Sequence, residues 1–221
     1  GLLAYNTGEV DGFQTAGLAA RSRERVRGFQ TAGIVAMGGG DLQGFQTSGV
    51  AAWNEGRLRG FQTSGVFAYN AGDLDGLQTA VASIVGGEVK GLQTGVAAKA
   101  ASVKGLQVSV VNISGSVAGL QAGVINIAGT VRGSQVGVLN LAGESKGVVV
   151  GVVNLAKKFD ALPIGLVSLG SNLRPGLDVT LEESGWGNLS LRFDGDLFHS
   201  RIGGVADLSD AIRLTRLQQA R

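Results

Sequence analysis

The sequence predicts an all-β protein whose main part, residues 1–170, is a β-solenoid of 14–16-residue coils. Three observations carry this prediction. Short motifs recur at regular spacing, and β-favouring residues fill the recurring positions. Glycine makes up 38 of the 221 residues, about 17%, against roughly 7% in average proteins. An antiparallel hairpin that caps the stack is expected in residues 171–221. An up-and-down β-barrel is the alternative architecture.

The repeat is visible as one glycine-glutamine motif that runs through three quarters of the chain. Gly-Phe-Gln-Thr stands at 12–15, 28–31, 44–47 and 60–63, and Gly-Leu-Gln stands at 76–78, 91–93, 105–107 and 119–121. The spacing between successive motifs therefore shortens along the chain. Residues 1–11 match residues 65–75, so the chain opens within a repeat, and we expect the natural array to extend toward the N-terminus.

The residue types in the repeat favour strands over helices. Val, Ile, Leu, Thr and Phe occupy the recurring positions, and glycine recurs too often for stable helices. A helical repeat needs about 30 residues, which a 14–16-residue period does not supply. A barrel strand would alternate over about ten residues. Residues 119–128 show no clean alternation, which favours a solenoid whose phase resets at each corner.

In a solenoid, each repeated residue lies above its equivalent in the preceding coil, so equivalent residues form a column along the axis. Successive members of a column are about 4.8 Å apart. A buried aliphatic column two residues before the repeat glycine is expected, with its clearest members at Val89, Val103, Val117 and Val131. A ladder of amide side chains is expected from the glutamines, because amides in register can hydrogen-bond along a stack. Its members are Gln14, Gln30, Gln46, Gln62, Gln78, Gln93, Gln107, Gln121 and Gln135.

A second ladder is expected from asparagines that recur at every fourteenth position, namely Asn112, Asn126, Asn140 and Asn154. Asn6, Asn54 and Asn70 hold a similar place in the longer repeats. Asparagine tolerates left-handed backbone and caps turns with its own side chain. The sequence therefore predicts that this ladder lies at a corner of the coil and has a structural role.

Composition and charge argue against several function classes. Cysteine is absent and His199 is the only histidine, so thiolate sites and histidine metal clusters within one chain are excluded. A net charge of +2 gives no support for nucleic-acid binding. No phosphate loop or catalytic triad spacing stands out. Alternating surface charges explain the carboxylates near His199 better than a hydrolase site does. We expect no enzyme activity, no cofactor and no small-molecule substrate.

One segment of the repeat is unusual because it carries no charge. Between Lys104 and Arg132, 27 consecutive residues are uncharged. Monomeric surfaces seldom expose so much apolar area, so this segment is the best candidate for contact with another chain, the C-terminal part or a membrane. The expected partner is a second copy or another surface protein, with outer-membrane contact as a further expectation.

The C-terminal part changes pattern. Alternation at Leu177–Leu181 and Leu189–Phe193 predicts two half-buried strands of a hairpin, which Leu197, Phe198 and Ile202 continue into a third strand. Residues 209–221 are read as a short helix or a frayed strand. The region is either a cap of the solenoid or the start of an antiparallel barrel segment.

The run GLQAGVINIAGTVRGSQVGVLNLAGESKGVVVGVVNLA resembles bacterial surface repeat proteins from organisms with an outer membrane. Their repeat has the form Gly-aliphatic-Gln-x-Gly-aliphatic-aliphatic-Asn-aliphatic-Ala. Residues 105–156 match it, residues 12–104 match with Phe-Gln-Thr variants, and residues 163–193 are similar to the segment that follows those repeats. The resemblance implies export and a place at the cell surface or outer membrane, and it implies no catalytic residues.

The function expected from the sequence is therefore a non-enzymatic, surface-exposed structural or interaction protein: a stalk, an adhesin-like module or a fibre subunit. The alternative is a membrane-embedded β-barrel or pore component, which rests on the uncharged segment.

Overall fold

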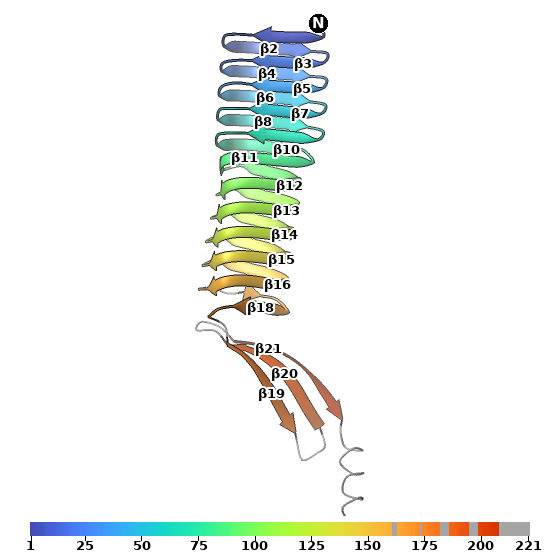
Figure 1. Ribbon diagram of the computed structural model, residues 1–221, viewed down its shortest axis with the longest axis vertical. Coiled ribbons are helices and arrows are strands. Elements are labelled where there is room, and N and C mark those ends of the chain that lie inside the picture. The colour runs from blue at the N-terminus through green and yellow to red at the C-terminus, as the bar shows by residue number, and fades with distance from the viewer. Residues whose placement is uncertain (161–162, 173, 182–185, 195–198, 208–221) are drawn as a thin grey trace, which may run out of the picture.

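The computed structural model describes residues 1–160, 163–172, 174–181, 186–194 and 199–207. Its first 18 strands form one continuous sheet that winds into a β-solenoid, and every pairing within it is parallel. The predicted solenoid is confirmed (Figure 1). Neighbouring strands of an up-and-down barrel are antiparallel. The alternative architecture is therefore wrong for these residues.

The N-terminal coils each contain a longer strand, of seven residues in β2, β4, β6 and β8 and six in β10, and a shorter strand of four. The longer strands begin at the buried column and end just after the repeat motif. The bounds are β1 Leu3–Asn6, β2 Val10–Ala16, β3 Ala19–Ser22, β4 Val26–Ala32, β5 Val35–Gly38, β6 Leu42–Ser48, β7 Ala51–Asn54, β8 Leu58–Ser64, β9 Phe67–Asn70 and β10 Leu74–Thr79.

From residue 92 onward each coil is spanned by one long strand, after a transition through β11. The transition strand is β11 Ala82–Val89, and the long strands are β12 Leu92–Val103, β13 Leu106–Val117, β14 Leu120–Val131, β15 Ser134–Ser145 and β16 Val148–Phe159. A short final coil contains β17 Pro163–Ile164 and β18 Val167–Gly170. Pro163 pairs with Val149 in the neighbouring coil at this end of the stack.

The coil becomes shorter by one residue at each of two corners. Thr79 pairs with Thr63, sixteen positions earlier, whereas Ala82 pairs with Phe67, fifteen positions earlier. A second residue is lost between Ala100 and Ser102, where the register shifts again. The strands between the corners keep their partners, so the core pattern continues unchanged through the transition.

The interior is a set of columns that run along the axis. One residue per coil forms the buried column: Val10, Val26, Leu42, Leu58, Leu74, Val89, Val103, Val117, Val131, Ser145 and Phe159. Eleven coils at about 4.8 Å each give a rod on the order of 50 Å long. Each coil covers the apolar interior of the next, so stability accumulates coil by coil.

Close approach between coils requires glycine at the start of the repeat motif. A Cβ atom on Gly44 would lie well inside van der Waals contact with the carbonyl oxygen of Gly28, and a Cβ on Gly119 would meet Gly105 in the same way. Gly44 also has φ +129°, which side-chain-bearing residues rarely adopt. The glycine columns therefore set how tightly the coils stack.

A separate three-stranded antiparallel sheet follows the solenoid. It contains β19 Arg174–Leu181, β20 Trp186–Asp194 and β21 His199–Asp207, in that order. The predicted antiparallel hairpin is confirmed, and Ile202 of the predicted third strand lies in β21, whereas Leu197 and Phe198 lie outside the described residues. Whether the sheet acts as a cap stays a prediction. The interpretation of residues 209–221 lies outside the described residues.

Candidate functional site

The glutamines of the predicted ladder lie together in one buried column. Eight of them, from Gln30 to Gln135, have no exposed surface, and Gln14 at the end of the stack is 8% exposed. In each coil the side-chain Nε2 donates to Oε1 of the glutamine in the preceding coil, over 2.7–3.0 Å. In the longer coils Nε2 also donates across the interior to a backbone carbonyl, as Gln46 does to Trp53. The ladder therefore joins coils to each other and the two walls within a coil.

The asparagines that recur at every fourteenth position also lie together, in a second buried column. Asn112 Nδ2 donates to Asn126 Oδ1, Asn126 to Asn140, and Asn140 to Asn154, each over 2.8–2.9 Å. Each of the four also donates to a backbone carbonyl, as Asn126 does to Val136 in the next coil. The donors of this ladder point toward the C-terminus, whereas those of the glutamine ladder point toward the N-terminus.

The asparagine column differs from the prediction in two respects. Its members lie within strands β13–β16, and no non-glycine residue described has a positive φ, so none uses left-handed backbone. Asn54 and Asn70 belong to a different column, because Asn70 pairs with Val85 and Val85 with Ala100. The Asn112 column passes through Ala98 and Ser83 instead. Asn54 and Asn70 are the members that bond to corner carbonyls, such as those of Gly56 and Gly72.

Asn54 and Asn70 form a third, shorter ladder, in which Asn54 Nδ2 donates to Asn70 Oδ1 over 2.8 Å. Each of the three ladders leaves one buried oxygen without a hydrogen-bond donor at the coil where it stops. These atoms are Gln135 Oε1, Asn112 Oδ1 and Asn54 Oδ1. Beyond them the column holds Val149, Ala98 and Gly38, respectively, which offer no side-chain donor. An orphaned buried acceptor costs about 1–3 kcal/mol, so ladder ends are weaker points than ladder interiors.

The predicted aliphatic residues Val89, Val103, Val117 and Val131 occupy the buried column, all with no exposed surface. They belong to two adjoining clusters, one on each side of the boundary between Val103 and Val117. The structure therefore places these valines and the two ladders inside the rod, where they hold neighbouring coils together.

The outer surface carries three columns that sequence reasoning did not group. They lie side by side on one face of the rod, defined here as the uncharged face. The first column directly follows the repeat glycine and consists of Phe13, Phe29, Phe45, Phe61, Leu77, Leu92, Leu106, Leu120, Ser134 and Val148. The middle column consists of Thr15, Thr31, Thr47, Thr63, Thr79, Thr94, Val108, Ala122, Val136, Val150 and Ile164. The third column, called the corner column, consists of Leu18, Ile34, Val50, Val66, Val81, Val96, Val110, Val124, Val138, Val152 and Leu166.

The uncharged face combines two mostly apolar columns with a middle column that is threonine in the first six coils and aliphatic in the later ones. The four phenylalanine rings stack with centroids 4.7–4.9 Å apart and planes within 5°. The corner column from Leu18 to Leu166 is exposed by 42–58% at every coil. Writing the sequence in coils would have shown this face, because no charged residue occurs between the repeat glycine and the corner column in any of these coils.

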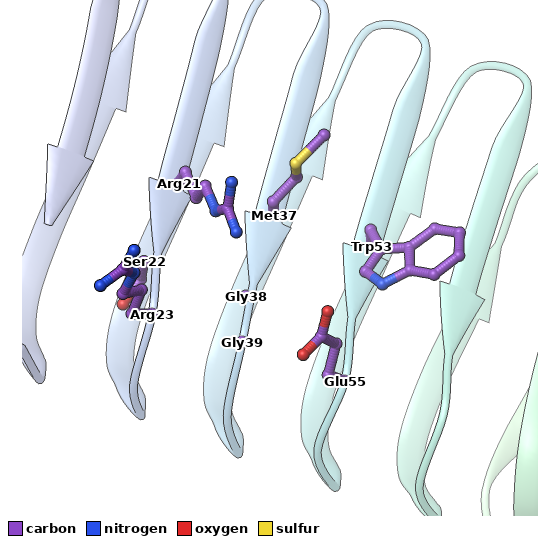
Figure 2. A pocket seen from close by; sticks show the side chains of 8 residues that line it. All are labelled: Arg21, Ser22, Arg23, Met37, Gly38, Gly39, Trp53 and Glu55. Carbon is purple, nitrogen blue, oxygen red and sulfur yellow. The ribbon is translucent and has the colours of Figure 1, made fainter. Parts of the chain in front are cut away.

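A notch of about 290 Å³ opens on another side of the N-terminal coils (Figure 2). Arg21 and Arg23 line one wall, Trp53 and Glu55 line the other, and the coil between them contributes Met37 and the bare backbone of Gly38 and Gly39 (Figure 2). Arg23 also lies over the Tyr5 ring at 5.9 Å. The notch offers guanidinium donors, an indole ring and a carboxylate, all on the open surface.

Groups that perform acid–base or metal chemistry do not gather in the described part of the chain. No cluster of three His, Asp or Glu side chains that could hold a metal ion occurs among those residues. His199, the first residue of β21, pairs in register with Asp194, the last residue of β20, while Glu182, Glu183 and Asp196 lie outside the described residues. The described residues also contain no helix long and apolar enough to cross a membrane.

Comparison of the chain with protein-family models, with curated proteins and with solved structures finds no match.

Proposed function

We propose that this protein is a non-enzymatic structural and interaction module of a bacterial cell surface, in which the solenoid acts as a rigid stalk. The observation that carries the proposal is the unbroken glutamine ladder from Gln14 to Gln135, which crosses the change in coil length without a gap. Such a ladder ties each coil to its neighbour. A stack joined in this way sets a fixed distance between its two ends.

Charge and surface chemistry support the same role. Corner residues pair across coils, as Lys104 does with Glu88 at 3.0 Å and Arg57 with Asp73 at 3.9 Å. Exposed pairs of this kind contribute at most about 1 kcal/mol each, so the interior ladders and columns supply most of the stiffness. The resemblance of residues 105–156 to bacterial surface repeats supports export to the cell surface.

The stalk role is tested by removing whole coils. Deletion of residues 106–119, or of 106–133, removes one or two of the shorter coils and rejoins the repeat in phase. We expect a folded rod that is shorter by about 5 Å or about 10 Å, measured as the longest dimension in small-angle X-ray scattering.

The matched control is deletion of residues 106–112, which removes half a coil and puts every later column out of phase. This variant should lose β structure in circular dichroism. Whole-coil deletions that unfold the chain, or leave its length unchanged, would contradict a stalk built of additive coils. Surface exposure is tested separately with antibodies against residues 1–170 on cells that naturally produce the protein. Staining of intact cells is expected, and staining only after permeabilisation refutes a surface location.

A further inference from the structure

The structure points to a second copy of this chain as the occupant of the uncharged face, in a side-by-side dimer with both rods running in the same direction. We propose this parallel dimer on the basis of the rod described above, and it therefore rests on the stalk function. Three features of the face support it: its apolar character, its size and repeat distance, and the charges along its edge.

The outer parts of the face are apolar at every coil, and in the C-terminal coils the middle column is apolar as well. The corner column exposes an aliphatic side chain at every coil, from 42% of Leu18 to 58% of Leu166. In the C-terminal coils the middle column adds Val108, Val136 and Ile164, each exposed by 41–47%. Between these two columns lies an open apolar groove of about 710 Å³, with Gly137 and Gly151 among its lining residues. Contiguous apolar patches of this kind on soluble proteins usually mark an interface.

The dimensions of the face suit a stable protein dimer. Eleven coils give a length of about 50 Å, and four or five residues from the first to the third column give a width of about 14 Å. The product is roughly 700 Å², close to the roughly 800 Å² that each partner contributes to a standard specific interface. A partner must also match a ridge that repeats at every coil, about 4.8 Å apart. A second solenoid of the same chain has that repeat distance along its entire length.

Charge decides the direction of the partner. One edge of the uncharged face is bordered by a charged column just before the repeat glycines: Asp11, Arg27, Gln43, Arg59, Asp75, Lys90, Lys104, Ala118, Arg132, Lys146 and Asp160. Six of these residues are cations and three are anions. The other edge is bordered by the wholly apolar column that runs from Ala19 to Val167.

A two-fold axis parallel to the rods places the charged column of each copy beside the apolar edge of the other. A two-fold axis perpendicular to the rods instead brings the two charged columns, each with a surplus of cations, against one another. Like charges across an interface are unfavourable. The parallel arrangement avoids this repulsion, sets the middle columns against each other, and brings each coil to the same coil of its partner.

The experiment compares two double variants with matched exposure. I34K/V108K places two lysines on the uncharged face at side chains 44% and 41% exposed. M37K/I113K places two lysines beyond the corner at side chains 42% and 40% exposed. Sedimentation equilibrium should give a dimer for the unmodified chain and for M37K/I113K, and a weakening of dimerisation of at least 100-fold for I34K/V108K.

Direction is tested with introduced cysteines, because the chain has none of its own. Thr47 lies in the third coil and Val136 in the ninth coil of the middle column. T47C alone should form a disulfide-linked dimer under mild oxidation. Cross-linking of T47C only to V136C in a mixture would overturn the parallel arrangement.

The remaining outcomes also decide the proposal. A chain that stays monomeric at all concentrations overturns the dimer, and so does a monomer that binds phosphatidylcholine vesicles and loses that binding in I34K/V108K. Small-angle scattering on the same samples separates the two proposals. A monomeric particle that keeps the full rod length leaves the stalk function standing, whereas a compact or unfolded particle removes both.

Discussion

The coils before residue 80 and those after residue 91 stack on the same interior columns but differ in coil length and in their corners. In the early coils equivalent glutamines lie sixteen positions apart, each coil has two separate strands, and a glycine with positive φ starts each repeat motif, from Gly12 to Gly76. In the later coils the glutamines lie fourteen positions apart, one long strand spans the coil, and the repeat glycines have no positive φ. The buried column and the glutamine ladder run through both regions.

The comparison shows which features define the solenoid and which adapt. One residue is lost at each of two corners, yet Gln93 still bonds to Gln78 at 3.0 Å and to Gln107 at 2.8 Å. The corner polar groups do change. Asn54 and Asn70 bond to corner carbonyls in the long coils, whereas Asn112 to Asn154 form a ladder within the strands of the short coils. The interior columns are therefore the fixed part of the fold, and the corners are the variable part.

The largest loss of folding stability should come from adding a methyl group to the glycine column. Stability is measured by urea unfolding, in the I34K/V108K variant so that association does not contribute. Gly44→Ala combines left-handed strain with a clash against Gly28, and we expect a loss of more than about 3 kcal/mol. Gly119→Ala introduces clashes with the backbone of Gly105 and Lys104 but no left-handed strain, so its loss should be smaller. Gly12→Ala introduces only strain at φ +110°, with open space around its Cβ, and should cost about 1–2 kcal/mol.

Losses that decrease in the order Gly44, Gly119, Gly12 would show that close approach costs more than backbone strain and that the two costs add at Gly44. Equal losses at Gly12 and Gly44 would instead mean that the distance between coils does not depend on glycine.

The next largest effect should come from interrupting the glutamine ladder. Gln121→Leu leaves Gln107 Oε1 without its donor and Gln135 Nε2 without its acceptor, so the loss should be about 2–5 kcal/mol. Gln135→Leu orphans Gln121 Oε1 but removes the unsatisfied Oε1 of Gln135 itself. Its net cost should be about 1 kcal/mol or less. A ladder that contributes nothing to stability would give the same small change at both positions.

The smallest of these effects should come from the aromatic column that distinguishes the early coils. Phe45 stacks on Phe29 and Phe61 with centroids 4.7 and 4.9 Å apart. Phe45→Leu gives this coil the side chain that later coils carry, and two lost ring pairs should cost about 1–2 kcal/mol in urea unfolding. Leu106→Phe, which adds an aromatic ring with no ring on either side, should change stability by less than about 0.5 kcal/mol. A neutral Phe45→Leu would mean that the stacked rings do not stabilise the early coils.

Much of the fold could be predicted from the sequence, because residues one repeat apart in the sequence contact each other in neighbouring coils. The regular Gly-Phe-Gln-Thr motif and the uniform residue types at Val89 and Val103 indicate which positions lie above one another. The asparagine columns could not be matched in this way. Matching by residue type groups Asn70 with Asn112, but Asn70 lies eight residues after Gln62 and Asn112 lies five residues after Gln107. The loss of one residue after Thr79 does not remove this difference, so the two asparagines stand in different columns.

The uncharged face was predicted only in part for a related reason. The 27 uncharged residues between Lys104 and Arg132 stand out in the linear sequence. In the linear sequence of the long coils, charged residues such as those from Arg21 to Arg27 separate the segments that form this face. Those charges lie outside the three columns, which only the coil register shows.

The central claim, that equivalent residues lie directly above one another at one coil spacing, is tested most directly by distances between paired spin labels. Thr31 is five coils from Val108 and seven coils from Val136 in the same column. Labels in T31C/V108C and T31C/V136C, diluted with unlabelled protein, should be separated by about 24 Å and about 34 Å in electron–electron double resonance. Equal distances in the two variants, or a shorter one for T31C/V136C, would contradict the stacked solenoid.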